Sequence, residues 1–311
     1  DELVRIAVMG AGGMGGCLGA HLAKAGNDVT LIARSAHLEA IRRNGLRLKT
    51  QDGDFTVNTA ATDDPGQVGS VDLVLFTVKT YHNAQAIPLI KPLIGHGPAI
   101  LTLQNGVESY EELGNVFGIG HVMPGASYLA ATVEEPGVIL QESSNVRIAF
   151  GEINGTPSPR AVRAHETMLR AGIQAELSRD VIKSLWTKFL VLAPISGITS
   201  SNRTRIHRLL QNPESKSDFL AAMKEVEAVG RAKRVELDED IVETMLNFIQ
   251  GFDDFQNSMH TDVEQGRPLE LEALSGAVVR LGSKEGVSTP VNEKFYAALL
   301  PHIYGTNDVD S

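Results

Sequence analysis

One lysine stands in the most apolar helical stretch of the chain. The stretch covers residues 184–195, and Lys188 lies near its middle. A buried ammonium must be paired, lose its proton or reach a wet cleft, and a desolvated lysine can donate a proton near neutral pH. The alternative is a side chain that lies along apolar surface with its charged head in solvent. Lys188 is therefore a candidate general acid, and Pro194 predicts an end or a kink in its helix.

A glycine-rich turn near the N-terminus has the pattern that binds a dinucleotide. Gly10, Gly12 and Gly15 form G-x-G-x-x-G after an apolar run, and a helical pattern and a second strand follow. These glycines allow a tight turn, close approach of the backbone to a pyrophosphate, and close packing of helix on strand. A purely structural turn is the alternative. The expected cofactor-binding residues of the turn are Gly10, Ala11, Gly12, Gly13, Met14 and Gly15.

The residue at the end of the second strand predicts which nicotinamide cofactor binds. This residue is Arg34, at 34 − 15 = 19 positions after Gly15. An acidic residue there would bind the ribose 2′-hydroxyl of NAD, whereas an arginine can accept the 2′-phosphate of NADP. A solvated surface arginine is the alternative. The sequence therefore predicts NADP(H).

Two more polar residues follow predicted strands, where ligands of open α/β sheets collect. Lys79 follows a strand predicted over residues 71–78, and Asn105 comes soon after one predicted over 99–103. Each is a candidate for binding cofactor and substrate, although a helix cap or a surface group is the alternative for each.

The second half of the chain adds carboxylates and a serine. A helix predicted over residues 253–264 places Ser258 and Asp262 on one face. Pro268 predicts the start of another helix, with Glu270 and Glu272 in its first turn. The alternative role for these glutamates is favourable interaction with the helix dipole.

The order of elements predicts an α/β protein with an N-terminal Rossmann-type doubly wound parallel sheet and a second, all-α domain. Residues 121–150 alternate as short strands that we expect to extend the sheet, and helical periodicity dominates after Arg179. The predicted domains are an NADP(H)-binding domain over 1–179 and an α-helical substrate and dimerisation domain over 180–311. Apolar faces of the last helices could pair two subunits or form core.

Composition excludes several classes of function. The net charge of −10 argues against nucleic acid and anionic membrane as partners. The single cysteine, Cys17, excludes an intramolecular disulfide, and we expect it to be a packed residue. The histidines show no metal-ligand spacing. No uninterrupted apolar run reaches the roughly 20 residues of a membrane span, and the early first strand leaves no room for a signal peptide. We expect a cytoplasmic protein without a metal.

Taken together, these motifs resemble those of the ketopantoate reductases (2-dehydropantoate 2-reductases), over nearly the full chain. The matching pieces are residues 10–15, Arg34, residues 78–81, residues 103–106, residues 185–188, Ser258-Met259 with Asp262, and Glu270 followed by residues 274–276. The resemblance implies NADPH-dependent reduction of 2-dehydropantoate to (R)-pantoate in pantothenate synthesis, in a cleft between the two domains.

The resemblance also implies roles for individual residues. Lys188 would be the general acid, and Glu270 would hold the substrate hydroxyl or the lysine. Ser258 would bind the substrate carboxylate, and Asn105 and Lys79 would line the cleft. The glycine turn and Arg34 would bind NADPH.

The chain departs from the family one and two helical turns after Lys188. The family usually has asparagines there, whereas this chain has Leu192 and Ser196. Leu192 cannot bind a hydroxyl, and Ser196 could do so with a shorter reach, so a different small 2-oxo acid is an alternative substrate. A 3-hydroxyacid or polyol-phosphate dehydrogenase and a non-catalytic NADPH sensor are further alternatives.

Overall fold

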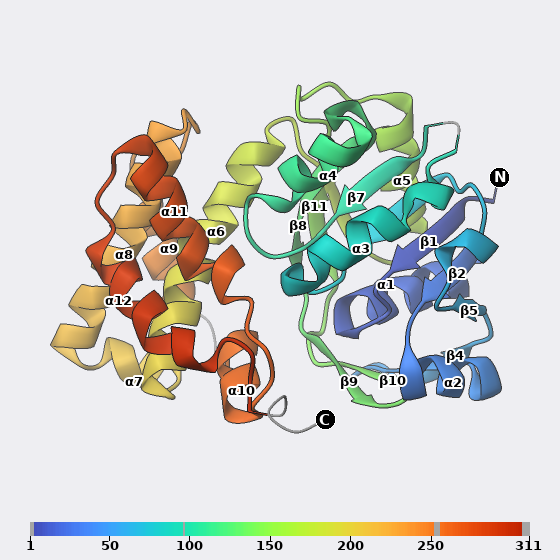
Figure 1. The fold of residues 1–311 in the computed structure, drawn as a ribbon, viewed down its shortest axis with the longest axis horizontal. Helices are drawn as coiled ribbons and strands as arrows, with labels where there is room; N and C mark the ends of the chain where they lie inside the picture. Colours follow the sequence, from blue (N-terminus) through green and yellow to red (C-terminus); the bar gives the residue numbers. More distant parts are fainter. Residues whose placement is uncertain (1–2, 96, 252–255, 307–311) are drawn as a thin grey trace. The chain divides into compact units, whose positions relative to one another are not determined.

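The computed structural model describes residues 3–95, 97–251 and 256–306. The chain divides into two compact units (Figure 1). The first, here called the sheet unit, comprises Asp1–Gln104 and Ser109–Val181. The second, the helical unit, comprises Ile182–Ser311 together with the short segment Asn105–Glu108.

The main sheet of the sheet unit has eight strands in the order β12-β11-β8-β7-β6-β1-β2-β5. Every neighbouring pair is parallel except β8 and β11. Its strands are β1 (Arg5–Met9), β2 (Asp28–Ile32), β5 (Ala60–Thr62), β6 (Leu73–Phe76), β7 (Ala99–Thr102), β8 (Val122–Tyr128), β11 (Arg147–Phe150) and β12 (Gln174–Leu177). The central strands β6 and β7 are buried at every residue, as continuous apolar runs in a parallel sheet predict.

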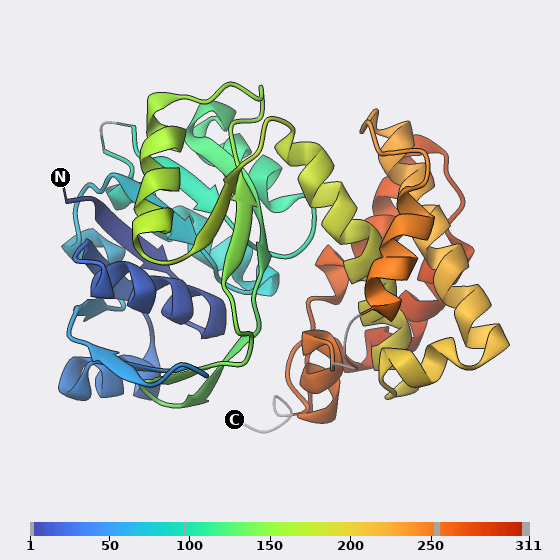
Figure 2. The same cartoon turned by 180° about the vertical axis from the view of Figure 1, so that it is seen from behind.

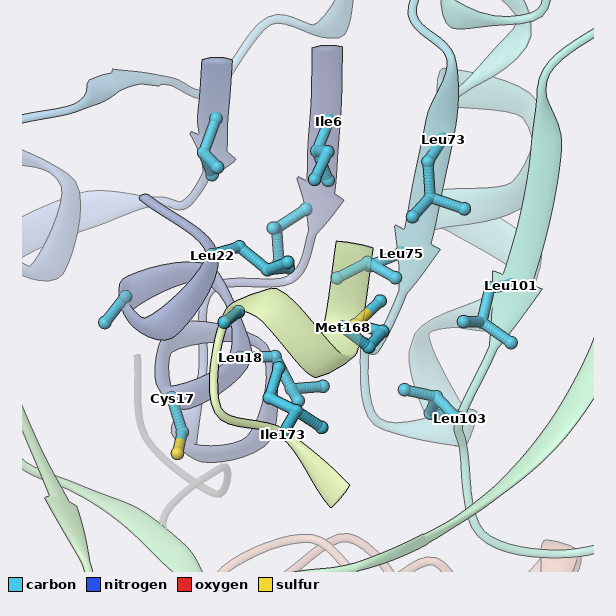
Figure 3. Packing of buried hydrophobic residues seen from close by; sticks show 14 of the residues in the cluster. Ile6, Cys17, Leu18, Leu22, Leu73, Leu75, Leu101, Leu103, Met168 and Ile173 are labelled. Carbon is cyan, nitrogen blue, oxygen red and sulfur yellow. The ribbon is translucent and has the colours of Figure 1, made fainter. Parts of the chain in front are cut away.

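Helices cover both faces of this sheet, which makes it doubly wound. On one face α1 (Gly13–Lys24) and α5 (Pro159–Arg170) enclose a core of alternate strand residues, among them Ile6, Leu73 and Leu75 (Figures 2 and 3). On the other, α3 (Asn83–Leu89) and α4 (Ser109–Phe117) pack on the intervening residues. The predicted fold class is confirmed. Cys17 is fully buried in the first core, where burial raises its pKa to about 12.

A second, four-stranded sheet, in the order β4-β3-β10-β9, corrects one prediction. Of the strands predicted to extend the main sheet, only β8 and β11 do so. β9 (Ala131–Glu135) and β10 (Val138–Gln141) instead pair with each other, and β10 pairs with β3 (Leu46–Lys49), which forms a hairpin with β4 (Phe55–Val57). Glycines on α1 allow this sheet to approach, since a Cβ at Gly13 would collide with the Ala131 carbonyl and one at Gly16 would be 2.9 Å from Ile139.

The helical unit contains α6 (Val181–Asn202), α7 (Ile206–Leu210), α8 (Pro213–Ala232), α9 (Ile241–Gln250), α10 (Ser258–Glu264), α11 (Ser275–Glu285) and α12 (Pro290–Leu299). Proline and a cap define the start of α8, because Pro213 occupies its first turn and the Asn212 side chain accepts hydrogen bonds from the Glu214 and Ser215 amides. Pro290 likewise begins α12.

Three predictions about helix ends need correction. α6 does not end at Pro194 but continues to Asn202, although proline lacks the amide that would bond one turn back, so of the predicted end or kink only the end is wrong. Pro268 does not start a helix: a short 3-10 turn, Leu271–Ala273, comes first, and α11 begins at Ser275. The helix predicted over 253–264 is seen from Ser258, and Asp253 lies outside the described residues.

The long helix α6 forms the core of the helical unit. Trp186 and Phe189 are buried with their rings edge to face, 5.5 Å apart, and Gly230 on α8 and Gly197 on α6 let Trp186 and Phe295 approach closely. Within the described residues, α6 is the one helix long and apolar enough to cross a membrane by length and composition. Because 67% of its apolar window is buried inside the protein, it matches the core helix of a globular unit.

The close packing of the glycine turn gives a stability prediction. A Cβ at Gly15 would collide with the Gly10 carbonyl, whereas one at Gly12 would meet no atom within 4 Å. Gly15→Ala should therefore lower the free energy of unfolding by about 1–3 kcal/mol, because overpacking forces the turn apart, and lower Tm by several degrees. Thermal unfolding followed by circular dichroism tests this, with Gly12→Ala as the control of unchanged Tm. Equal stability of the two variants would contradict it.

Candidate active site

Three of the predicted site residues form one hydrogen-bonded chain in the helical unit. The Lys188 ammonium donates to Oδ1 of Asn105 at 3.0 Å, and the Nδ2 amide of Asn105 donates to Oε2 of Glu270 at 3.4 Å. An ammonium has only donors and a carboxylate only acceptors, so these partners fix which way the Asn105 amide faces. Asn105 therefore links the lysine to the glutamate.

Burial lowers the pKa of Lys188 toward the neutral range. Lys188 is partly buried on α6, and Glu270 is 6% exposed. Desolvation lowers the pKa of Lys188 from 10.5 to about 8, against the opposing effect of the Glu270 carboxylate. The group is thus mostly charged at pH 7 and can release its proton at little cost.

The segment that carries Asn105 is docked in the helical unit by a glycine and an ion pair. Gly106 has φ +94°, and a Cβ there would be 2.8 Å from the Ala273 carbonyl, so glycine allows the close approach. Two residues later, Glu108 pairs with Arg280 on α11 at 2.6 Å. This docking places the Asn105 amide between Lys188 and Glu270.

A separate pocket of about 220 Å³ lies in the sheet unit at the carboxyl ends of β1, β2 and β6. Gly10, Ala11 and Gly12 form its floor, and Arg34 stands on its rim. Thr77, Val78 and two histidines, His37 and His82, also line the pocket. None of the described residues that line it is an aspartate or glutamate. A glycine turn with a cation and no carboxylate fits a phosphorylated dinucleotide.

The structure adds His37, which the sequence reading missed. Its Nδ1 accepts from the Gly137 amide at 3.0 Å, so Nε2 must carry the proton that it donates to the Ala11 carbonyl at 2.8 Å. Burial lowers the pKa of His37, which keeps the ring neutral. The ring therefore ties the glycine turn to the β9–β10 turn. Its position three residues after Arg34 was the signal available in the sequence.

The other predicted cofactor residues take different places. Gly13 and Gly15 allow close approach of the Ala131 and Gly10 carbonyls. Met14 packs against the core that α1 and α5 enclose. Lys79 follows β6 and precedes a 3-10 turn, and the Gln104 side chain donates to the carbonyl of the residue before it, Val78, at 2.6 Å. Gln104 thus helps to fix the start of the Lys79 loop.

The other predicted substrate residues are not brought into the lysine chain. Ser258 is exposed in the first turn of α10, whereas Asp262 is buried and paired with Arg267 at 2.8 Å. Ser196 is buried, and its hydroxyl has no hydrogen-bond partner among the described residues. Eight residues along α6 place it about 12 Å from Lys188 along the helix axis.

The sheet unit also has a cavity at the opposite ends of its strands. A larger cavity, about 450 Å³, lies at the amino ends of β1, β6 and β7, where Arg5 and Arg163 pair with aspartates and Arg160 with a glutamate. Ligands of parallel sheets collect at the opposite ends. In the part of the chain that the structure describes, no group of three or more histidine, cysteine, aspartate or glutamate side chains could hold a metal ion.

A doubly wound sheet with a glycine turn of the dinucleotide-binding pattern, joined to a helical unit that contains a lysine of lowered pKa, is typical of Rossmann-fold oxidoreductases with a helical C-terminal unit. Comparison with known proteins supports this class. The family described as Ketopantoate reductase PanE/ApbA matches residues 6–155, and its C-terminal counterpart matches residues 180–302.

Individual relatives match over nearly their full length. A 2-dehydropantoate 2-reductase of Mesorhizobium japonicum is 30% identical, over 92% of this chain and 94% of that protein. The crystal structure of a 2-dehydropantoate 2-reductase of Geobacter metallireducens is 31% identical with a TM-score of 0.89, over 96% and 99% of the two chains. A D-mandelate dehydrogenase solved with NADH and anilino(oxo)acetate has a TM-score of 0.88 over 96% and 97% of the chains, but at 21% identity this is a likeness of fold alone. The chain belongs to the ketopantoate reductase family and is an oxidoreductase.

The lysine chain gives a prediction about proton affinity. Glu270→Gln should lower the pKa of Lys188 below about 8, because it removes the carboxylate charge that favours the ammonium. NMR titration of ¹³C-methylated lysines measures this, with the Lys188 signal assigned by its loss in Lys188→Ala.

Glu272→Gln is the matched control for that titration. Its carboxylate accepts from the Tyr296 hydroxyl at 2.7 Å and pairs with Arg280 at 3.4 Å. This variant should leave the pKa of Lys188 unchanged. An unchanged or raised pKa in Glu270→Gln would show that Glu270 does not stabilise the ammonium.

Proposed function

We propose that this protein catalyses the NADPH-dependent reduction of 2-dehydropantoate to (R)-pantoate, a step of pantothenate synthesis, in the cytoplasm. The observation that carries the proposal is the Lys188–Asn105–Glu270 chain, which holds an ammonium of lowered pKa on an apolar helix. Relatives of about 30% identity over more than nine-tenths of the chain bear the name of this reaction.

NADP(H) is the proposed cofactor, bound by the domain predicted over residues 1–179. The pocket supports this, because its glycine turn fits a pyrophosphate, Arg34 can pair with a 2′-phosphate, and no described carboxylate of its lining could bind the ribose hydroxyls of NAD instead. The bound cofactor would supply the hydride to the substrate carbonyl.

Lys188 is the proposed general acid. Hydride addition to a ketone leaves negative charge on oxygen, and an ammonium stabilises that charge before it gives up a proton. Asn105 and Glu270 keep the ammonium charged and limit its motion. Ser258 would bind the substrate carboxylate, with Lys79 and Asn105 beside the cofactor and substrate. These roles, the substrate role of Ser196 and a homodimer through residues 180–311 stay predictions.

A specific observation favours a second candidate, a reductase of another small 2-oxo acid. Leu192 lies one turn after Lys188 and is partly exposed, so an apolar side chain follows the proposed acid on the same face of α6. A substrate hydroxyl would find no partner on Leu192, whereas an alkyl or aryl group would lose nothing there.

The loss of NADPH absorbance in the presence of 2-dehydropantoate tests the proposal. We expect turnover with 2-dehydropantoate and a much higher kcat/KM with NADPH than with NADH. A parallel panel should contain 2-oxoisovalerate, which lacks the hydroxymethyl group, and phenylglyoxylate. Faster turnover of 2-oxoisovalerate or phenylglyoxylate than of 2-dehydropantoate would contradict the first proposal and support a reductase of another 2-oxo acid. NADPH binding with no turnover of any 2-oxo acid would support a sensor.

Removal of the proposed acid gives a separate prediction. Lys188→Ala should lower kcat by about 10²–10⁴-fold, the usual contribution of a positioned acid, and leave the Kd of NADPH unchanged. In the wild type, kcat/KM should fall as pH rises through about 8, because only the protonated lysine can donate. Lys183→Ala is the control, since Lys183 on the same helix pairs with Asp238 at 2.6 Å. Lys188→Ala turnover within tenfold of wild type would remove Lys188 from this role.

A further inference from the structure

His82 and Arg34 line the same pocket from two different loops. Arg34 follows β2, and His82 ends the 3-10 turn Thr80–His82 after β6. β2 and β6 flank β1, whose glycine turn forms the floor between them. Both side chains belong to exposed residues, so each can reorient toward a ligand. The two rims of the pocket therefore present one permanent cation and one titratable ring.

The two histidines of the pocket differ in their freedom to bind a proton. His37 uses both ring nitrogens in backbone hydrogen bonds, and its protonation would break the bond from the Gly137 amide. His82 packs edge to face on Tyr81, with ring centroids 4.6 Å apart, and its ring makes no hydrogen bond to any described residue. Only His82 can gain a proton without loss of a structural bond.

The charges around His82 keep it neutral before a ligand binds. Burial and then the positive charge of Arg34 lower its pKa. The other titratable groups around it are His37 in the pocket lining, Tyr81, Lys79 three residues before it and, on α4, Glu112, which accepts from the side chain of the adjacent Asn83 at 2.7 Å. None of the described pocket residues is acidic, so nothing in the lining favours a second positive charge. A phosphate of charge near −2 beside Arg34 would reverse this balance.

We propose that His82 takes up a proton from solvent when the 2′-phosphate of NADPH binds beside Arg34, to an extent that depends on pH, and that the protonated ring then donates a hydrogen bond to a phosphate oxygen. This inference rests on the proposed NADPH function. It makes the preference for NADPH over NADH increase as pH falls toward 6.5. His82 thus acts as a specificity-determining residue whose contribution depends on pH.

The probes are 2′,5′-ADP, which carries the 2′-phosphate, and 5′-AMP, which lacks it. Isothermal titration calorimetry of the full chain at pH 7, in buffers of different ionisation enthalpy, gives the number of protons taken up. With 2′,5′-ADP, we expect wild type to take up a measurable fraction of a proton more than His82→Gln does. With 5′-AMP, we expect wild type and His82→Gln to take up the same number of protons. Protons released by the phosphate itself are common to both proteins and cancel in this difference.

Affinity provides a second readout. Between pH 7.5 and 6.5, the ratio of the Kd of His82→Gln to that of wild type should rise by about threefold for 2′,5′-ADP, as expected for one partly titrating charge–phosphate bond. His82→Lys should bind tightly without this pH dependence, since its charge does not titrate there. His165→Gln is the control: His165 contacts the Ala175 carbonyl at the far edge of the sheet, and this variant should match wild type.

The outcomes separate this inference from the cofactor proposal. If wild type prefers 2′,5′-ADP to 5′-AMP, and Arg34→Gln loses that preference, the 2′-phosphate binds as proposed. Equal proton uptake by wild type and His82→Gln would then overturn the role of His82 alone. If wild type does not distinguish the two probes, both the NADPH preference and the inference are wrong.

Discussion

A charged amine on an apolar helix is the constraint from which the arrangement of the helical unit follows. Lys188 needs an oxygen acceptor, and α6 has no carboxylate of its own near it. The acceptor comes from Asn105, more than 80 positions earlier in the chain, and the compensating charge from Glu270. Gly106 and the Glu108–Arg280 pair hold the segment that carries Asn105 in place. The charge of Lys188 is thus stabilised by residues from distant parts of the sequence.

The sheet unit holds the proposed cofactor pocket, whose local charge differs in sign from the net charge of the chain. The net charge is −10, yet the pocket above the glycine turn has Arg34 on its rim and no described carboxylate in its lining. The His37 ring joins the glycine turn to the β9–β10 turn of the second sheet, which restrains the backbone of the proposed phosphate site. Rigid positioning of N–H groups is what makes such a turn an effective phosphate site.

Membership of the ketopantoate reductase family defines the type of reaction more firmly than the substrate. Selectivity between 2-oxo acids depends on the few groups that face the substrate side chain, and a missing hydrogen-bond partner there changes discrimination far more than it changes the fold. In the proposed site, Leu192 would be such a change, and the Ser196 hydroxyl, which has no partner among the described residues, lies a further turn along the same helix.

Local sequence determined the features that depend on neighbouring residues. Continuous apolar runs gave the central strands, the glycine spacing gave the turn before α1, and Arg34 and Lys79 followed from their positions after strands. Tertiary structure decided what depends on distant partners. Strands β9 and β10 have ordinary strand patterns, and only the small residues of α1 and the pairing with β3 place them in a second sheet. Pro194 lies inside α6 because burial of the surrounding apolar residues outweighs one lost hydrogen bond. The Lys188–Asn105–Glu270 chain and the tautomer of His37 likewise join residues far apart in sequence, whose contact no local spacing encodes.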